Sequence, residues 1–241
     1  MNVGIDLSPY FAKYEQLMQG VDKIFQRMSN DYPGEVKCSN GCTDCCFALF
    51  DLTLVEALYL NRQFQELGQD VKNMILVEAD KADRKTHKIK RKLFKAHEGG
   101  ASEEEILKSA GQERVQCPLL VEDRCVLYEF RPLTCRLYGL PMKVGESTVS
   151  CSRSGFEPGV QYPTVDMQKL HEQLLHLSQE LAKGIGTRYA ELHTVLVPVS
   201  MALLTEYGQE YLGIDAPENS CESSSKDQKG PTREWVLGSG E

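Results

Sequence analysis

The sequence predicts a mainly α-helical protein with irregular, cysteine-rich loops around a metal centre. Long stretches place apolar residues at three- and four-residue steps, which is typical of helices with one buried face. Two of these stretches follow a capping-box pattern, and strand signals are weak. Eight of the nine cysteines lie between positions 38 and 151, in short segments that contain Gly and Pro. With 241 residues and 41% apolar content, the chain can bury a sizeable core.

The first predicted helix lies within residues 1–35 and is expected to pack on the core. Ser8 is a candidate N-cap and Pro9 suits the first helical position. Turn-forming residues at 31–34 end the helix. The expected buried face consists of Tyr10, Phe11, Tyr14, Leu17, Met18, Val21, Ile24, Phe25 and Met28.

Two capping boxes mark later helix starts. Thr53 with Glu56, and Ser102 with Glu105, have the spacing at which each side chain bonds the other residue's amide. The first box opens a helix that Gly68 ends, and the second opens a short acidic helix that ends near Gly111.

Between these boxes, a helix over 69–97 begins apolar and ends basic, and Gly99 stops it. Its cationic half, residues 81–95, predicts a solvated face. A protein partner, RNA or an anionic membrane is the alternative for this face.

Residues 156–214 are predicted to form the C-terminal helices of the same domain. Pro163 and Thr164 open the first, and another helical stretch covers 188–211 with an interruption at Pro198. The seam of the first helix favours core packing, with a dimer interface as the alternative, and consists of Met167, Leu170, Leu174, Leu177 and Leu181.

The remaining residues, 215–241, are rich in Ser, Glu, Lys and Gly and predict a disordered tail. Cys221 lies in this tail and is expected to be a bystander, while Trp235 is a candidate for a short binding motif.

Charge and hydropathy narrow the function classes. The net charge of −8 argues against nucleic-acid binding, which needs a basic surface. We see no basic-then-apolar start typical of a secretory signal and no apolar run of about 20 residues, so we expect a cytoplasmic protein with no membrane insertion. Thiols stay reduced there, and an odd cysteine count makes a poor disulfide framework.

Reduced cysteines in this pattern predict metal ligands within a domain spanning 36–155. Zinc and iron–sulfur clusters both accept all-thiolate shells. Eight thiolates suit two four-cysteine sites, or one cluster plus a second ion. Arg124, Arg131 and Arg136 lie near the later cysteines and could offset thiolate charge or bind an anion. The candidate ligands are Cys38, Cys42, Cys45, Cys46, Cys117, Cys125, Cys135 and Cys151.

Over residues 36–155 the chain resembles the YkgJ-type cysteine-cluster proteins. The motifs that carry the resemblance are Cys38-x3-Cys42-x2-Cys45-Cys46, the Thr53-x-x-Glu56 helix start, Cys117-Pro118-Leu119, the segment from Cys125 to Glu129, and Arg131-Pro132-x-x-Cys135-Arg136. The resemblance implies chelation of zinc or iron and no agreed reaction.

Several alternatives stay open at this point. The metal is either structural, as in an adaptor, or part of an iron–sulfur enzyme with redox or methyl-transfer chemistry. The Cys38, Cys42, Cys45 spacing also occurs in radical S-adenosylmethionine enzymes, but Asp44 stands where those enzymes usually carry an aromatic residue. The five histidines fall outside the cysteine groups and are expected to be ordinary surface or core residues.

Overall fold

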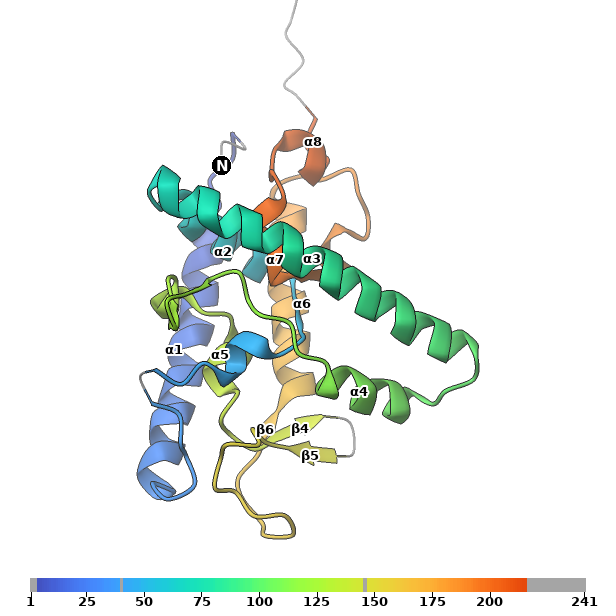
Figure 1. The fold of residues 1–241 in the computed structure, drawn as a ribbon. Coiled ribbons are helices and arrows are strands. Elements are labelled where there is room, and N and C mark those ends of the chain that lie inside the picture. The colour runs from blue at the N-terminus through green and yellow to red at the C-terminus, as the bar shows by residue number, and fades with distance from the viewer. Residues whose placement is uncertain (1–3, 40, 145–146, 216–241) are drawn as a thin grey trace, which may run out of the picture.

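The structure is a computed structural model that describes residues 4–39, 41–144 and 147–215, and it is mainly α-helical, as predicted (Figure 1). Within those ranges the α-helices are α1 Ser8–Asp31, α2 Leu54–Gln65, α3 Gln69–Glu98, α4 Glu103–Gln112, α5 Leu133–Leu137, α6 Met167–Gly184, α7 Val199–Leu204 and α8 Gln209–Leu212. The 3₁₀ turns are η1 Asp44–Phe47, η2 Tyr128–Phe130 and η3 Leu192–Thr194. The strands are β1 Asp51–Leu52, β2 Leu120–Val121, β3 Arg124–Cys125, β4 Met142–Val144, β5 Ser147–Val149, β6 Val165–Asp166 and β7 Val197–Pro198.

Helix α2 is the centre of the core. All residues from Leu54 to Asn61 are buried, which requires neighbours on every side of the helix. The predicted capping box is present, with the Glu56 carboxylate accepting from the Thr53 amide at 3.1 Å. At the helix's other end, Asn61 Nδ2 donates to the Ala202 carbonyl at 2.8 Å and thereby fixes α7 beside α2.

Helices α1 and α6 pack against each other and against α2 (Figure 1). The buried face of α1 follows the predicted apolar periodicity and includes Phe11, Tyr14 and Met18, but Ile24 is exposed. Leu174 in the apolar seam of α6 is buried, which supports the prediction that this seam packs in the core. Buried residues of the same seam are Leu177 and Leu181.

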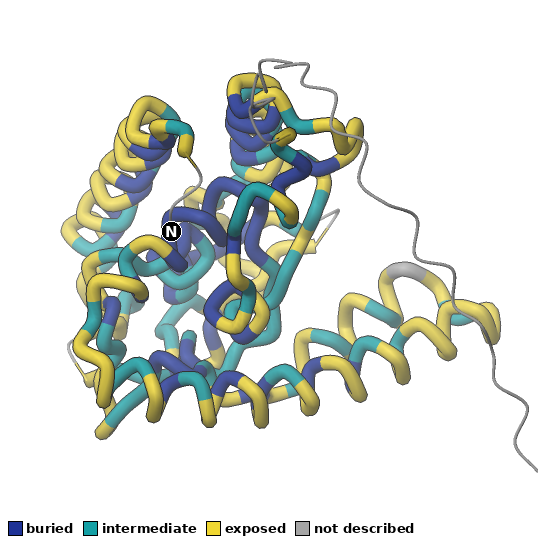
Figure 2. The backbone as a smooth tube through the Cα atoms, turned by 90° about the horizontal axis from the view of Figure 1, so that it is seen from above, coloured by how far each residue is buried: buried dark blue, intermediate teal, exposed yellow. Residues whose placement is uncertain are grey.

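Helix α3 crosses α7, and its second half extends from the body as an arm with α4 alongside (Figure 2). Figure 2 shows that most of this arm is exposed. Its inner face carries a small separate cluster formed by Ala82, Ile89 and Val115. The arm therefore contacts the segment that leads to Cys117, and Lys90 of the arm also pairs with Asp51 of β1 at 2.6 Å.

Two predicted helix starts are wrong by a few residues. Ser8 is the first residue of α1 and not its cap, because the Ser8 amide donates to the Asp6 side chain at 2.9 Å. Helix α6 begins at Met167 instead of Pro163, because Val165–Asp166 pairs with β4 as strand β6. Asp166 then caps α6 by accepting from the Lys169 amide at 3.1 Å.

The predicted helical stretch over 188–211 is also wrong as a single element. It consists of η3, β7, α7 and α8. Strand β7 pairs antiparallel with β1, with Asp51 opposite Pro198, and this extended pairing keeps Val197 and Pro198 out of any helix. The predicted interruption of the helical stretch at Pro198 is present, since α7 begins at the next residue, Val199.

Residues 115–160, predicted to be irregular, contain α5 and several short strands. β2 and β3 form a hairpin whose turn residues, Glu122 and Asp123, have positive φ angles of 48° and 58°. β4 lies between β5 and β6 in a three-stranded sheet below the helices (Figure 1). Of the predicted tail only Asp215 is described, so Cys221 and Trp235 lie outside the described residues.

Candidate metal centre

The two cysteine segments meet through their backbones. The Val115 amide donates to the Phe47 carbonyl at 3.2 Å, and the Cys117 amide donates to the Cys46 carbonyl at 2.6 Å. Turn η1, which carries Cys45 and Cys46, therefore lies against the strand-like segment before β2. Residues separated by about 70 positions in the chain thus bring their sulfurs to one place.

Two small elements add further cysteines beside Cys45, Cys46 and Cys117. The hairpin of β2 and β3 sets Cys125 opposite Leu120. Helix α5 carries Cys135, and the Leu133 amide at its start donates to the buried Glu56 carboxylate at 3.3 Å. The central helix α2 thus orients the cysteine-bearing helix directly.

Five cysteines form what we call the five-sulfur group: Cys45, Cys46, Cys117, Cys125 and Cys135. The thiols of Cys135 and Cys46 lie within hydrogen-bond reach of the Cys45 sulfur and lower the pKa of Cys45. Burial raises the pKa of Cys117 to about 12, and the bond to Cys45 together with burial raises that of Cys135. Cys45 is therefore the thiol of this group that loses its proton first.

A cavity of about 440 Å³ opens onto the five-sulfur group. All five cysteines line it, together with Cys42. The opposite wall is formed by Ala82 and Thr86 of α3 and by the residues around the start of α7, including Ser200. A volume of this size falls in the range of small-molecule pockets and far exceeds that of one ion.

Cys38, Cys42 and Cys151 form a second set, the three-sulfur group. They line a hollow of about 10 Å³ beside Gly139 and Arg153. Cys38 is exposed as a residue, but desolvation of its sulfur, followed by the charges of Cys42 and Cys151, raises its pKa to about 11. Burial also raises the pKa of Cys151, whose thiol donates to Asp44 Oδ2 at 3.2 Å. Five of the eight predicted ligands thus lie together and three lie beside them, with Cys42 lining both cavities.

Of the three arginines expected near the later cysteines, Arg131 acts on the sulfurs. Its charge lowers the pKa of Cys45 and opposes the rise at Cys125. Its guanidinium carbon lies 3.5 Å from the centroid of the Tyr128 ring, which holds the side chain at the cavity wall.

Arg124 lies at the cavity rim in an exposed position. Arg136 is turned away from the sulfurs: it pairs with Asp22 at 2.6 Å, and its Nε donates to the Arg131 carbonyl at 2.9 Å. Arg136 therefore braces the loop before α5, and the expected role in offsetting thiolate charge does not apply to it.

Asp44 and Arg114 are site residues that the sequence analysis missed. Asp44 is buried, and Arg114 Nη2 donates to its Oδ1 at 2.6 Å. Burial raises the pKa of Asp44, but hydrogen bonds from Cys151 and Arg114 outweigh burial and lower it, so Asp44 carries a charge at neutral pH. The sequence signal that could have identified Asp44 is its position between two cysteines of the motif, Cys42 and Cys45.

The donor set fits a thiophilic metal in chemistry and proximity. Thiolate sulfur is the ligand that zinc and iron–sulfur clusters prefer, and the sulfurs are close enough to shift one another's pKa. Among the described residues, however, no group of three or more His, Cys, Asp or Glu side chains is placed so that it could hold a metal ion as it stands. Binding therefore requires the thiols to lose protons and turn toward a shared centre.

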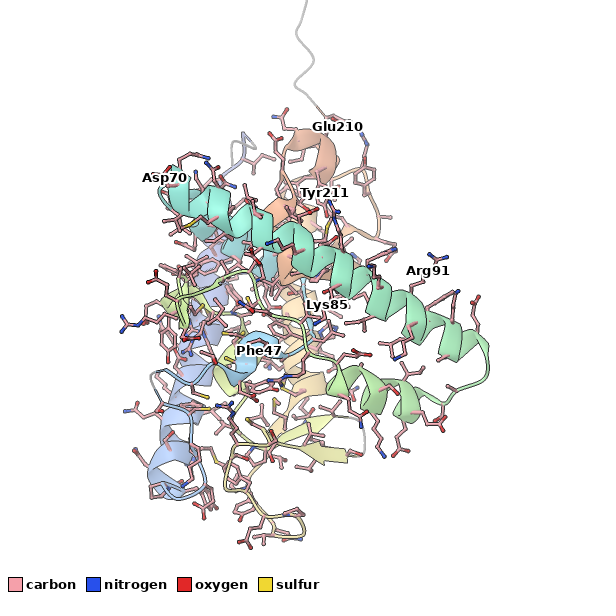
Figure 3. All side chains as sticks on the ribbon, viewed as in Figure 1. Phe47, Asp70, Lys85, Arg91, Glu210 and Tyr211 are labelled. Carbon is pink, nitrogen blue, oxygen red and sulfur yellow. The ribbon has the colours of Figure 1, made fainter. Side chains whose placement is uncertain are left out.

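Other predicted binding features lie away from the sulfurs. No histidine of the described residues lines either of these two cavities, and the expected ordinary roles of the histidines stay a prediction. On the basic half of α3, Lys90 pairs with Asp51 at 2.6 Å, and Lys85 donates to the Arg114 carbonyl at 2.7 Å. Figure 3 shows Lys85 near the segment before Cys117, with Arg91 pointing to solvent. A protein partner for this helix stays a prediction.

The described helices include none that is both long and apolar enough to cross a membrane. The expected cytoplasmic location stays a prediction.

Comparison with known proteins gives one match. Residues 37–152, just under half of the chain, match the profile of the CxxCxxCC family, described as a "putative zinc- or iron-chelating domain". The segment agrees with the 36–155 range expected from the sequence. No curated protein and no solved structure matches the chain significantly.

Proposed function

Because residues 37–152 match the model of the CxxCxxCC family, we propose that the protein binds zinc or an iron–sulfur cluster through the thiolates of its clustered cysteines. The five-sulfur group is the primary site. The eight cysteines named from the sequence remain the candidate ligands, with the three-sulfur group on the adjoining side.

One observation carries this proposal: the amide of Cys117 bonds the carbonyl of Cys46. The contact joins the two cysteine segments at the residues that carry the sulfurs. A chain whose cysteines were merely scattered buried thiols would not need its two motif halves to pair at those positions.

The chemistry of the group makes metal binding depend on pH. Burial raises the pKa of Cys117 and Cys135, so a metal must displace their protons, and binding should strengthen as the pH rises. Arg131 offsets part of the negative charge that several thiolates leave on one centre.

Purification without oxygen, followed by metal and acid-labile sulfide analysis, tests the proposal. Acid-labile sulfide with iron identifies an iron–sulfur cluster, and zinc without sulfide identifies a zinc site. Cys135→Ser should lose most of the bound metal and unfold at lower temperature, because Cys135 lies within the five-sulfur group. Cys221→Ser serves as the matched control and should keep wild-type metal content. Equal metal content in both variants would contradict the proposal.

A chemical role for the metal is the second candidate, and the cavity favours it. The 440 Å³ cavity extends past the sulfurs to walls from α3 and α7, so a metal held there would adjoin space for a small molecule. An enzyme site keeps such an open position, whereas a purely structural site is closed. Cobalt-substituted protein distinguishes the two, because added azide should change its visible spectrum only at an open site.

A further inference from the structure

The three-sulfur group lies in surroundings that differ from those of the five-sulfur group. Its hollow has a volume of about 10 Å³, which is about the room of one water molecule or ion. The five-sulfur group faces a cavity of about 440 Å³. The two groups are therefore suited to occupants of different size.

Two glycines allow close contacts near Cys38 and near Cys151. A Cβ atom at Gly139 would overlap the Cys38 sulfur, so only glycine leaves room for that sulfur. The Gly155 amide donates to the Glu35 carbonyl at 2.7 Å, and a Cβ atom there would lie 2.9 Å from the Gly34 carbonyl oxygen. The segment before Cys38 and the turn after Cys151 are thus held together by backbone contacts that larger residues would break.

Asp44 adds an oxygen to these sulfurs. Its Oδ2 accepts from the Cys151 thiol at 3.2 Å, while Oδ1 is held by Arg114 at 2.6 Å and lies 3.7 Å from Arg153. Because Arg114 engages Oδ1, Oδ2 stays directed at Cys151. An ion that replaced the Cys151 thiol proton would find a carboxylate oxygen already in place.

We propose that Cys38, Cys42 and Cys151, with Oδ2 of Asp44 as the fourth ligand, form a separate site for one divalent ion such as zinc. This inference rests on the proposed function, since it extends thiolate chelation to a second centre. Sulfur and carboxylate oxygen are both accepted ligands of tetrahedral zinc. Binding releases the protons of the three thiols to water.

Formal charges at this site agree with the proposal. Three thiolates and one carboxylate carry −4, and a divalent ion leaves −2. Two guanidinium groups, Arg114 and Arg153, lie against Asp44 and offset this charge.

The test compares metal content per chain in anaerobically purified full-length variants. Gly139→Ala should displace the Cys38 sulfur and reduce the content by one divalent ion, while the metal of the five-sulfur group remains. Gly20→Ala is the matched control, because a Cβ atom there meets nothing within 4 Å, and it should keep wild-type content. Wild-type content in Gly139→Ala would overturn the proposal.

Two further variants cover the case in which Gly139→Ala does not fold. Cys151→Ser should lose the same single ion, and Asp44→Asn should weaken its binding by at least about 10-fold, because loss of even an outer-shell partner typically costs that much. Loss of all metal from Cys151→Ser would show one shared centre and overturn the second site alone. A wild-type chain without metal would instead defeat the proposed function itself, so the two failures are distinguishable.

Discussion

Glu56 is a carboxylate at the centre of the core, with 4% of its surface exposed. Burial raises its pKa, although the Thr53 and Leu133 amides donate to it and act in the opposite direction. Because the pKa in the folded protein lies above that of the unfolded chain, folding favours the protonated form. The stability from this group is therefore complete below the unfolded pKa and is lost as the pH rises through the folded value.

Glu56→Gln should remove this pH dependence, since Gln also serves in a capping box. We expect the free energy of unfolding of Glu56→Gln, relative to wild type, to rise between pH 4 and pH 7 in urea titrations. Glu56→Ala leaves two amides without an acceptor and should cost about 2 kcal/mol. If the difference in free energy of unfolding between wild type and Glu56→Gln stays constant across this pH range, Glu56 does not titrate there.

At the same scale, the sequence could identify the cysteines but not their grouping. Cys45 and Cys46 are adjacent to each other, yet Cys42, only three residues away, lies with Cys38 and Cys151. The grouping depends on Gly139 and on the backbone contact at Gly155, which no spacing within the motif reveals. Arg136 shows the same limit, because its partner Asp22 lies on a helix outside the motif.

Helix termini show which elements could be predicted. The boxes at Thr53 and Ser102 depend only on residues three positions apart, and both are present. The start of α6 and the segment over 188–211 were wrong because β6 and β7 pair with distant strands. Local patterns carry no signal for those pairings, so tertiary contacts override them.

The cap of α1 gives a direct test. Asp6→Ala removes the acceptor of the Ser8 amide and should lower the melting temperature. Ser8→Ala should lower it much less, because the Ser8 side chain makes no capping bond. Thermal unfolding of the two variants measures the difference. A larger loss for Ser8→Ala than for Asp6→Ala would restore Ser8 as the cap.

At the scale of the whole molecule, the segment that matches the family model, residues 37–152, packs against helices that lie outside it. Tyr59 of α2 packs edge-on against Phe11 and Tyr14 of α1, with ring centroids 5.5 and 5.0 Å apart. The Val55 amide donates to Ser178 of α6 at 3.2 Å. Residues 37–152 alone would expose these surfaces and lose the α7 wall of the cavity.

A fragment of residues 37–152 should therefore fail to fold cooperatively, even with added zinc. Circular dichroism during heating should show no sharp transition, since most of the partners of α2 are missing. A fragment of residues 1–215 is the control and should melt like the full chain, because it contains every buried residue that the structure describes. A sharp transition in the shorter fragment would show that the family segment is an independent domain.

The backbone bond between Cys117 and Cys46 has a consequence for how metal enters and leaves. Closing a loop of about 70 residues costs conformational entropy, and this cost grows only with the logarithm of loop length. Here the polypeptide itself closes the loop, so the entropy is lost during folding and not at the moment of binding. Ion exchange can then proceed by side-chain rotation alone, and the empty protein can persist between one metal and the next.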